Sequence, residues 1–176
     1  MAQEFELVTL KEAGIEQDIP EPYDTLEENA SNKSGTIYQL TGMDCFSEDT
    51  GLEVKALGGE PGVKSARYAG DKRSFDANIE KLLDRLKGYD DRQARFRTVI
   101  SLLIGGMENL FEGICEGRIT TEKHGKGGFG YDPVFIPRGS EKTFAEMDLA
   151  EKNRFSHRAR ALEKLVIFLN NKTLKH

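Results

Sequence analysis

The chain has 176 residues, which is the usual size of one domain and enough to enclose a substantial hydrophobic core. Its 25 Lys and Arg residues against 30 Asp and Glu residues give a formal net charge of -5. That balance argues against binding along a nucleic-acid backbone, which needs a basic face, whereas a small nucleotide needs only local positive charge.

Other features of the composition favour a cytoplasmic protein. No apolar run approaches the ~20 residues of a membrane span, and the acidic, mixed first residues do not resemble a signal peptide. Cys45 and Cys115 lie in apolar runs, without a CxxC or Cys/His cluster, so two reduced thiols are expected rather than a disulfide or zinc. We therefore expect no membrane partner.

The first half of the chain predicts two strands around a helix. Residues 5–10 read as a strand, and a polar connection with two prolines follows over residues 11–23. The pattern Asp24-x-x-Glu27 marks the start of a helix whose apolar residues keep roughly helical spacing until Gly42. Residues 43–46 predict a short buried strand. Glu48 and Asp49 would then lie beyond its C-terminal end, where open α/β sheets form ligand crevices.

The second half predicts a hairpin between two helices. Residues 59–73 form a glycine-rich loop, and Ser74 caps a helix that Gly88 ends. Apolar residues alternate over 95–104, which predicts a strand; residues 105–109 are a turn and 110–121 return as the partner strand. Residues 134–136 predict another strand, and Ser156 caps a final helix. The chain has no repeat or low-complexity linker, so residues 1–176 are expected to form one domain.

The most informative stretch is Gly-Lys-Gly-Gly-Phe-Gly-Tyr-Asp-Pro, residues 125–133. Glycine permits φ > 0 and close backbone approach, so this loop is expected to press against something flat or charged. It matches neither the P-loop pattern nor the Rossmann pattern. A pocket wall with one stacking ring, Phe129, is the functional interpretation; a plain hairpin loop explains this stretch alone about equally well.

Two further groups of residues suggest chemistry. Glu48 and Asp49 could hold a hard cation such as Mg²⁺, and a carboxylate there could take a proton from an attacking water. Taken alone, these acids fit an ordinary acidic turn better. His157 and Arg158 follow the cap Ser156, and cations in a first helical turn oppose the helix dipole. An acceptor-rich ligand would explain their presence there.

Together with the glycine-rich stretch, residues 25–30, 47–54, 61–70 and 151–158 resemble the inosine/xanthosine triphosphate pyrophosphatase family in motif order and spacing. The resemblance runs from about Phe5 to about Leu169. It implies an α/β fold with a long mixed, twisted sheet flanked by helices, in two lobes with a nucleotide-binding cleft between them. It also implies a homodimer that hydrolyses inosine, deoxyinosine and xanthosine triphosphates to the monophosphate and pyrophosphate, which cleanses the nucleotide pool.

The resemblance further implies a role for each site residue. Asp49 is the general base and a metal contact, and Glu21 and Glu48 complete a Mg²⁺ site. His157 and Arg158 read the 6-oxo group of the purine, which adenine lacks; guanine shares it and must be excluded by other contacts. The substrate-binding residues are Lys33, Thr50, Phe129, Gly130, Tyr131, Asp132, Lys152, His157 and Arg158. For Lys33 and Lys152, a solvated surface lysine is the alternative.

The chain departs from the family pattern at its start. Members open with a strand and a Thr-x-Asn-x-x-Lys turn that grips the phosphates, and no Asn and Lys at that spacing precede Phe5. An N-terminal truncation, a misplaced start or a lost central strand would each account for this. A nucleotide-binding protein with impaired catalysis is therefore one alternative function. A hydrolase of another triphosphate, such as dUTP, is a second.

Overall fold

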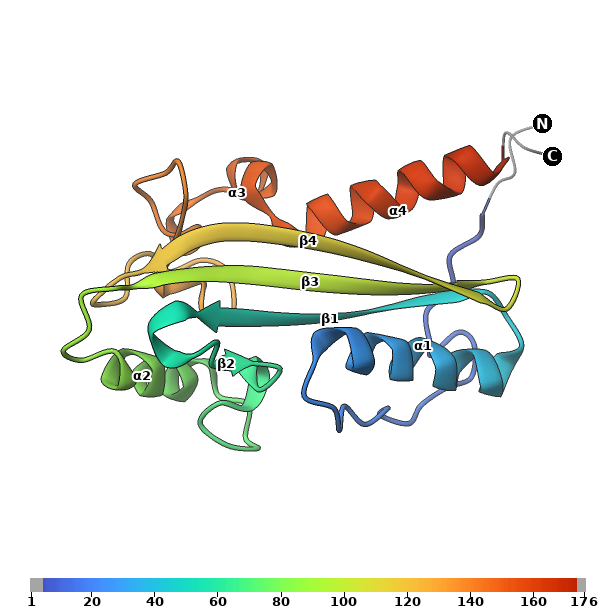
Figure 1. The fold of residues 1–176 in the computed structure, drawn as a ribbon, viewed down its shortest axis with the longest axis horizontal. Coiled ribbons are helices and arrows are strands. Elements are labelled where there is room, and N and C mark those ends of the chain that lie inside the picture. Colours follow the sequence, from blue (N-terminus) through green and yellow to red (C-terminus); the bar gives the residue numbers. More distant parts are fainter. Residues whose placement is uncertain (1–4, 174–176) are drawn as a thin grey trace.

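One twisted sheet forms the frame of the molecule in the computed structural model, which describes residues 5–173 (Figure 1). Within those residues the strands follow the order β2-β1-β3-β4-β5, and every neighbouring pair is antiparallel. The strands are β1 (Cys45–Val54), β2 (Pro61–Gly62), β3 (Gln93–Ile104), β4 (Met107–Ile119) and β5 (Phe135–Pro137). The helices are α1 (Leu26–Thr41), α2 (Phe75–Arg85), α3 (Leu149–Phe155) and α4 (His157–Thr173). The predicted α/β fold is confirmed, but its described sheet is antiparallel rather than mixed.

The hairpin of β3 and β4 was predicted well because its pattern is local. Gly105 and Gly106 form the turn with φ values of 59° and 75°, the left-handed pair that a two-residue hairpin turn requires. The turn is therefore shorter than the predicted residues 105–109, and β4 begins at Met107. Alternating residues of β3 face α4, where Ile100 and Leu102 pack with Ala161 and Leu165.

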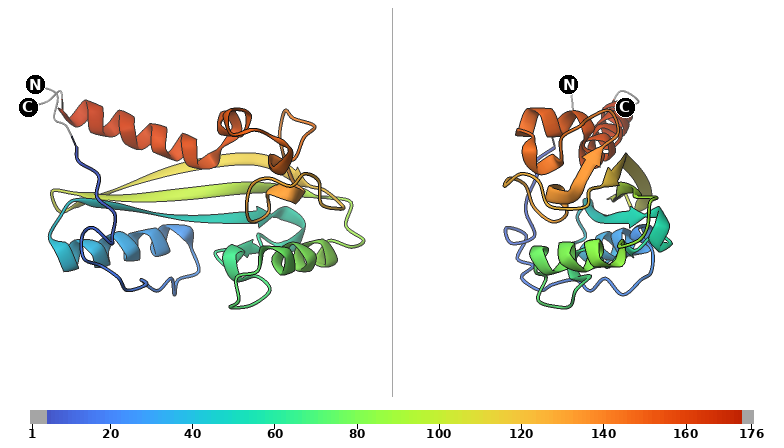
Figure 2. Two further views of the ribbon diagram at one scale, coloured as in Figure 1. Left: turned by 180° about the vertical axis from the view of Figure 1, so that it is seen from behind. Right: turned by 90° about the vertical axis from the view of Figure 1, so that its left-hand side faces the viewer.

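Helix α1 covers the opposite face of the sheet from α4 (Figures 1 and 2). Its cap is Thr25 rather than the predicted Asp24, because the Thr25 side chain accepts from the Glu28 backbone N–H and donates to the Glu28 carboxylate. Leu26 and Ala30 pack against Val99 of β3. This packing holds α1 against the centre of the sheet.

Strand β1 is longer than predicted. We expected a short buried strand over residues 43–46, yet β1 pairs with β3 along all of Cys45–Val54, and Phe46 is exposed. The two acids therefore lie in the middle of a strand, not beyond its end. Continuous pairing with β3 explains the difference, since the ladder carries polar side chains that sequence alone assigns to a turn.

The predicted strand over residues 5–10 is wrong. This segment is extended and then turns over Leu10–Gly14, and in the described part of the chain no strand pairs with it. A strand needs a neighbouring strand for its backbone hydrogen bonds, and within the described part of the chain residues 5–10 have no such neighbour; the carbonyls of Thr9 and Leu10 accept from the local turn instead. The segment instead lines one side of a cavity of about 740 Å³, whose other walls come from α1, β1 and residues 63–73. The cavity therefore lies between the N-terminal segment, α1, β1 and the loop after β2, and it is the counterpart of the predicted cleft.

A candidate nucleotide site

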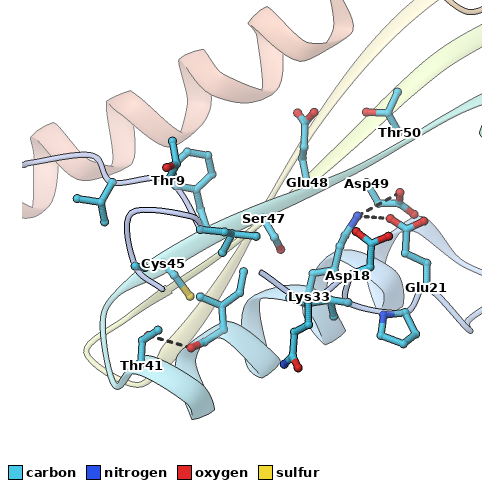
Figure 3. A pocket seen from close by; sticks show the side chains of 18 of the residues that line it. Thr9, Asp18, Glu21, Lys33, Thr41, Cys45, Ser47, Glu48, Asp49 and Thr50 are labelled. Atoms are coloured by element: carbon cyan, nitrogen blue, oxygen red, sulfur yellow. Dashed lines mark hydrogen bonds and ion pairs between the residues drawn. The ribbon is translucent and has the colours of Figure 1, made fainter. Parts of the chain in front are cut away.

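The first part of the site surrounds Asp49, which is only 8% exposed on the α1 side of β1. Lys33 of α1 extends toward it and places its Nζ 3.5 Å from Asp49 Oδ1 and 2.5 Å from Glu21 Oε1 (Figure 3). The second oxygen of Asp49, Oδ2, is buried and has no hydrogen-bond partner in the part of the chain that the structure describes. A buried, unsatisfied carboxylate oxygen is costly, so its place here is best explained by a ligand.

Burial raises the pKa of Asp49 above its ordinary value; the charge of Lys33 opposes this, and that of Glu21 adds to it. A carboxylate with a raised pKa is a stronger base than an exposed aspartate. Asp49 is therefore well suited to take a proton from water.

The same residues fit the predicted metal in part. Among residues 5–173, no group of three or more His, Cys, Asp or Glu side chains is gathered to hold a metal. Mg²⁺, however, is commonly held by one or two carboxylates together with water and substrate phosphates. Glu21 and Asp49 both approach the Lys33 ammonium, and Asp49 Oδ2 has a free acceptor site. These two carboxylates fit such an ion.

Glu48 does not join them. Successive side chains of a strand point to opposite faces, so Glu48 projects toward α4 while Asp49 projects toward α1 (Figure 3). There Glu48 pairs with Arg158, at 2.7 Å from Nη2 and 2.9 Å from Nε. Glu48 therefore lines the same cavity as Glu21 and Asp49, but its carboxylate pairs with Arg158 instead of lying beside Lys33.

The glycine-rich stretch forms a wall, as predicted, but its glycines meet protein atoms. A Cβ on Gly125 or Gly127 would contact the Ala145 backbone, and one on Gly128 would lie 2.1 Å from Asp132 Oδ2. The flat or charged surface that we expected is therefore the chain itself. Phe129 projects from this wall and is 56% exposed.

Asp132 and Lys152 form the base of that wall. Asp132, which is 3% exposed, accepts from the Phe129 backbone N–H at 2.9 Å and lies 2.5 Å from Lys152 Nζ. The same ammonium lies 4.7 Å from the centre of the Phe129 ring. Lys152 is thus held in the site and is not a solvated surface lysine.

Gly130 and Tyr131 complete the segment. Gly130 has φ 60° and open space beside it. Tyr131 is buried and donates its hydroxyl to the Ser65 carbonyl at 2.9 Å, which ties the wall to the glycine-rich loop after β2. The Tyr131 side chain therefore holds the wall in place, and its hydroxyl is already engaged by the protein.

His157 and Arg158 begin α4, and the predicted cap is confirmed by a 3.2 Å bond from the Ala159 N–H to Ser156 Oγ. The His157 ring stacks on Phe96, with centroids 4.9 Å apart. Burial, followed by the charges of Arg158 and neighbouring basic residues, lowers the pKa of His157 to about 3. His157 is therefore neutral at physiological pH, and its buried Nδ1 has no hydrogen-bond partner among residues 5–173.

A second cavity of about 370 Å³ joins these residues. It is lined by Thr50, Gly130 and the side chains of the wall and of α4, including Phe129, Lys152, His157 and Arg158. Thr50 and Ala66 line both this cavity and the one that contains Lys33 and Asp49. The two cavities thus meet beside β1 and can receive the two ends of one elongated ligand.

Two residues at the site were not among the predicted site residues. Phe96 supports the His157 ring, and its place in the apolar alternation of β3 gave no sign of this role. Arg67 lines the first cavity and donates to the Glu21 carbonyl at 3.1 Å. An arginine within a glycine-rich loop was the available signal for Arg67.

The sequence pattern of the Ham1 family matches residues 1–168 of this chain. A Ham1 protein of Staphylococcus aureus is 42% identical, with a TM-score of 0.86 over 89% of this chain and 82% of that chain. The fold is therefore that of a known class of proteins, and this chain is a member of the Ham1 family.

Relatives with assigned activities are also similar over most of their length. The dITP/XTP pyrophosphatase of Christiangramia forsetii is 54% identical over 166 residues, which are 94% of this chain and 87% of the relative. The enzyme of the same name from Bacillus subtilis is 44% identical, over 92% of this chain and 83% of the relative. In the part of the chain that the structure describes, no helix is long and apolar enough to cross a membrane.

Proposed function

We propose that this protein is a nucleoside triphosphate pyrophosphatase that hydrolyses inosine, deoxyinosine and xanthosine triphosphates to the monophosphate and pyrophosphate. The meeting of the two cavities at Thr50 is the observation that carries the proposal. The first cavity contains the general base Asp49 and the Lys33 cation for the phosphates. The second contains the Phe129 ring and hydrogen-bond donors for a purine. The relatives named above support the same activity.

Asp49 receives a proton from the water that attacks the phosphoanhydride between the α- and β-phosphates. Its burial and raised pKa favour this transfer. Lys33 stands beside the same carboxylate, so it can neutralise phosphate oxygens as the pyrophosphate leaves. Glu21 and Asp49 would hold the magnesium, which would supply neutralising charge to the triphosphate and orient it when bound.

The second cavity selects the base. Phe129 offers a face on which a purine can stack, while Lys152 and Arg158 offer hydrogen-bond donors. A 6-oxopurine presents an acceptor to such donors, whereas adenine presents an amino group at that position. A site built from donors rejects the mismatched base because its own groups then stay unpaired.

The alternative of a binding protein with impaired catalysis is not favoured. The groups that would act on the phosphates, Asp49, Lys33 and Glu21, lie together, and the relatives bear the name of active enzymes. The test measures pyrophosphate release with Mg²⁺ from ITP, dITP, XTP, ATP and dUTP. We expect the first three to be preferred by at least tenfold, and no preference for them would overturn the assignment.

The remaining parts of the proposal concern the setting of the enzyme. We place it in the cytoplasm, where nucleotide pools occur and where Cys45 and Cys115, both free thiols, stay reduced. We also propose a homodimer, because α4 exposes Leu162, Val166 and Ile167. Light scattering would check this, and a monomer at micromolar concentration would refute it. The acidic net charge supports the absence of nucleic-acid partners.

A further inference from the structure

We infer that Glu48 is a positioning residue for base recognition: it holds Arg158 in the purine cavity and thereby links that cavity to the strand that carries Asp49. The inference rests on the proposed function, and it gives Glu48 a role other than metal binding. It follows from the contacts of Glu48 and Arg158, from the donors that these contacts leave free, and from the face of β1 to which Glu48 belongs.

The contact joins residues far apart in the chain. Glu48 Oε1 lies 2.7 Å from Arg158 Nη2 and 2.9 Å from Nε, and Oε2 lies 3.0 Å from Nε. Two carboxylate oxygens thus grip one edge of the guanidinium. Such two-point contacts fix the plane of the guanidinium as well as its position.

The grip leaves the other edge of Arg158 available. A guanidinium has five N–H donors, and Glu48 engages Nε and one side of Nη2. Among the described residues, no hydrogen bond is made by Nη1, and Arg158 lines the purine cavity. The Nη1 and Nη2 donors can therefore form a fork for two neighbouring acceptors, such as O6 and N7 of a 6-oxopurine.

The geometry of β1 connects the Glu48–Arg158 contact to Asp49. Glu48 and Asp49 are neighbours on one rigid strand, and they project to opposite faces (Figure 3). Glu48 reaches the base reader on α4, while Asp49 faces Lys33 and Glu21. One strand thus fixes the distance between the recognised base and the reacting phosphate, which a reaction sensitive to ~1 Å displacements requires.

A double-mutant cycle tests the inference. Glu48→Ala should lower kcat/KM for ITP about tenfold, through KM more than kcat, and narrow the preference over ATP. The Mg²⁺ concentration for half-activation should not change. In an Arg158→Ala background, Glu48→Ala should cause no further loss, because the two residues act as one unit. Glu48→Asp should keep more of the preference for ITP over ATP than Glu48→Ala, because it retains a carboxylate for Arg158.

Glu53→Gln is the matched control. Glu53 lies on the same strand and pairs with Arg95 at 2.7 Å, but it lines neither cavity of the site. This variant should keep the ITP preference of the wild type, and circular dichroism would verify folding of every variant. An additive loss in the double mutant would show that Glu48 and Arg158 act independently, and a raised Mg²⁺ requirement in Glu48→Ala would make Glu48 a metal ligand; either result overturns the inference.

A binding measurement separates this inference from the proposed activity. Titration calorimetry with inosine monophosphate in the presence of a chelator needs neither turnover nor metal. Glu48→Ala should weaken binding of inosine monophosphate about tenfold and leave that of adenosine monophosphate unchanged. Unchanged affinity for both overturns the inference even if the enzyme is active. An inactive wild type that shows the expected change refutes the activity alone.

Discussion

The partly buried His157 gives the protein a specific dependence of stability on pH. Because its pKa is about 3 in the folded state and about 6.5 when unfolded, the unfolded chain binds the proton more readily between these values. The contribution of neutral His157 to the free energy of unfolding is therefore fully present above pH 6.5 and declines as the pH falls toward 3. The His157 contribution to this decline between pH 7 and pH 5 is about 2 kcal/mol.

The variant His157→Gln isolates that contribution, since a glutamine does not titrate. Urea unfolding followed by circular dichroism at pH 7 and pH 5, without nucleotide, gives both free energies of unfolding. The loss between the two pH values should be smaller in the variant by about 2 kcal/mol, or about 4–8 °C in melting temperature. If the variant and the wild type lost the same free energy of unfolding between pH 7 and pH 5, the lowered pKa of His157 would be refuted. His124→Gln, at an exposed histidine, is the control and should behave as the wild type.

Three further predictions concern single side chains. Asp49→Asn should abolish pyrophosphate release and leave the melting temperature at pH 7 equal or higher, because the burial that raises the pKa of Asp49 disfavours its charged form; measurable turnover would contradict its role as base. Arg158→Ala should reduce the preference for ITP over ATP about tenfold or more, the effect of losing one charged hydrogen bond; an unmoved ratio of kcat/KM values would exclude it from base reading. Gly113→Ala should destabilise the fold by about 1–3 kcal/mol, because its Cβ would lie 1.9 Å from the His157 carbonyl oxygen and force α4 off β4; a melting temperature equal to that of the wild type would contradict this packing.

Local patterns predicted helices α1, α2 and α4 and the hairpin well, but helix α3 was not predicted. Caps such as Ser74 and Ser156, together with apolar periodicity, depend on neighbours within a few residues, so the sequence contains them fully. The segment over residues 5–10 has a strand-like composition, yet its pairing depends on a distant partner that composition does not reveal. Long-range pairing is the part of the fold that local patterns specify least.

The site, like the fold, was predicted only in part. The resemblance brought Asp49, Lys33 and Glu21 together, and the structure places them within one cluster; their catalytic roles stay predictions. The position of Glu48 was missed because β1 was taken to end before it. Had the strand been extended, its alternation would have placed Glu48 and Asp49 on opposite faces. The pairing with Arg158 spans 110 residues and could not have been read from spacing.

The alternation of β1 has a consequence for how this gene can vary. A single substitution in the strand changes one side chain, but deletion of the Thr50 codon would rotate the preceding residues of the strand, Glu48 and Asp49 among them, to the other face. Asp49 would then face α4, and Glu48 would face α1. Base selection and hydrolysis would fail in the same event, so we expect length changes to be absent from this strand in functional variants of the protein.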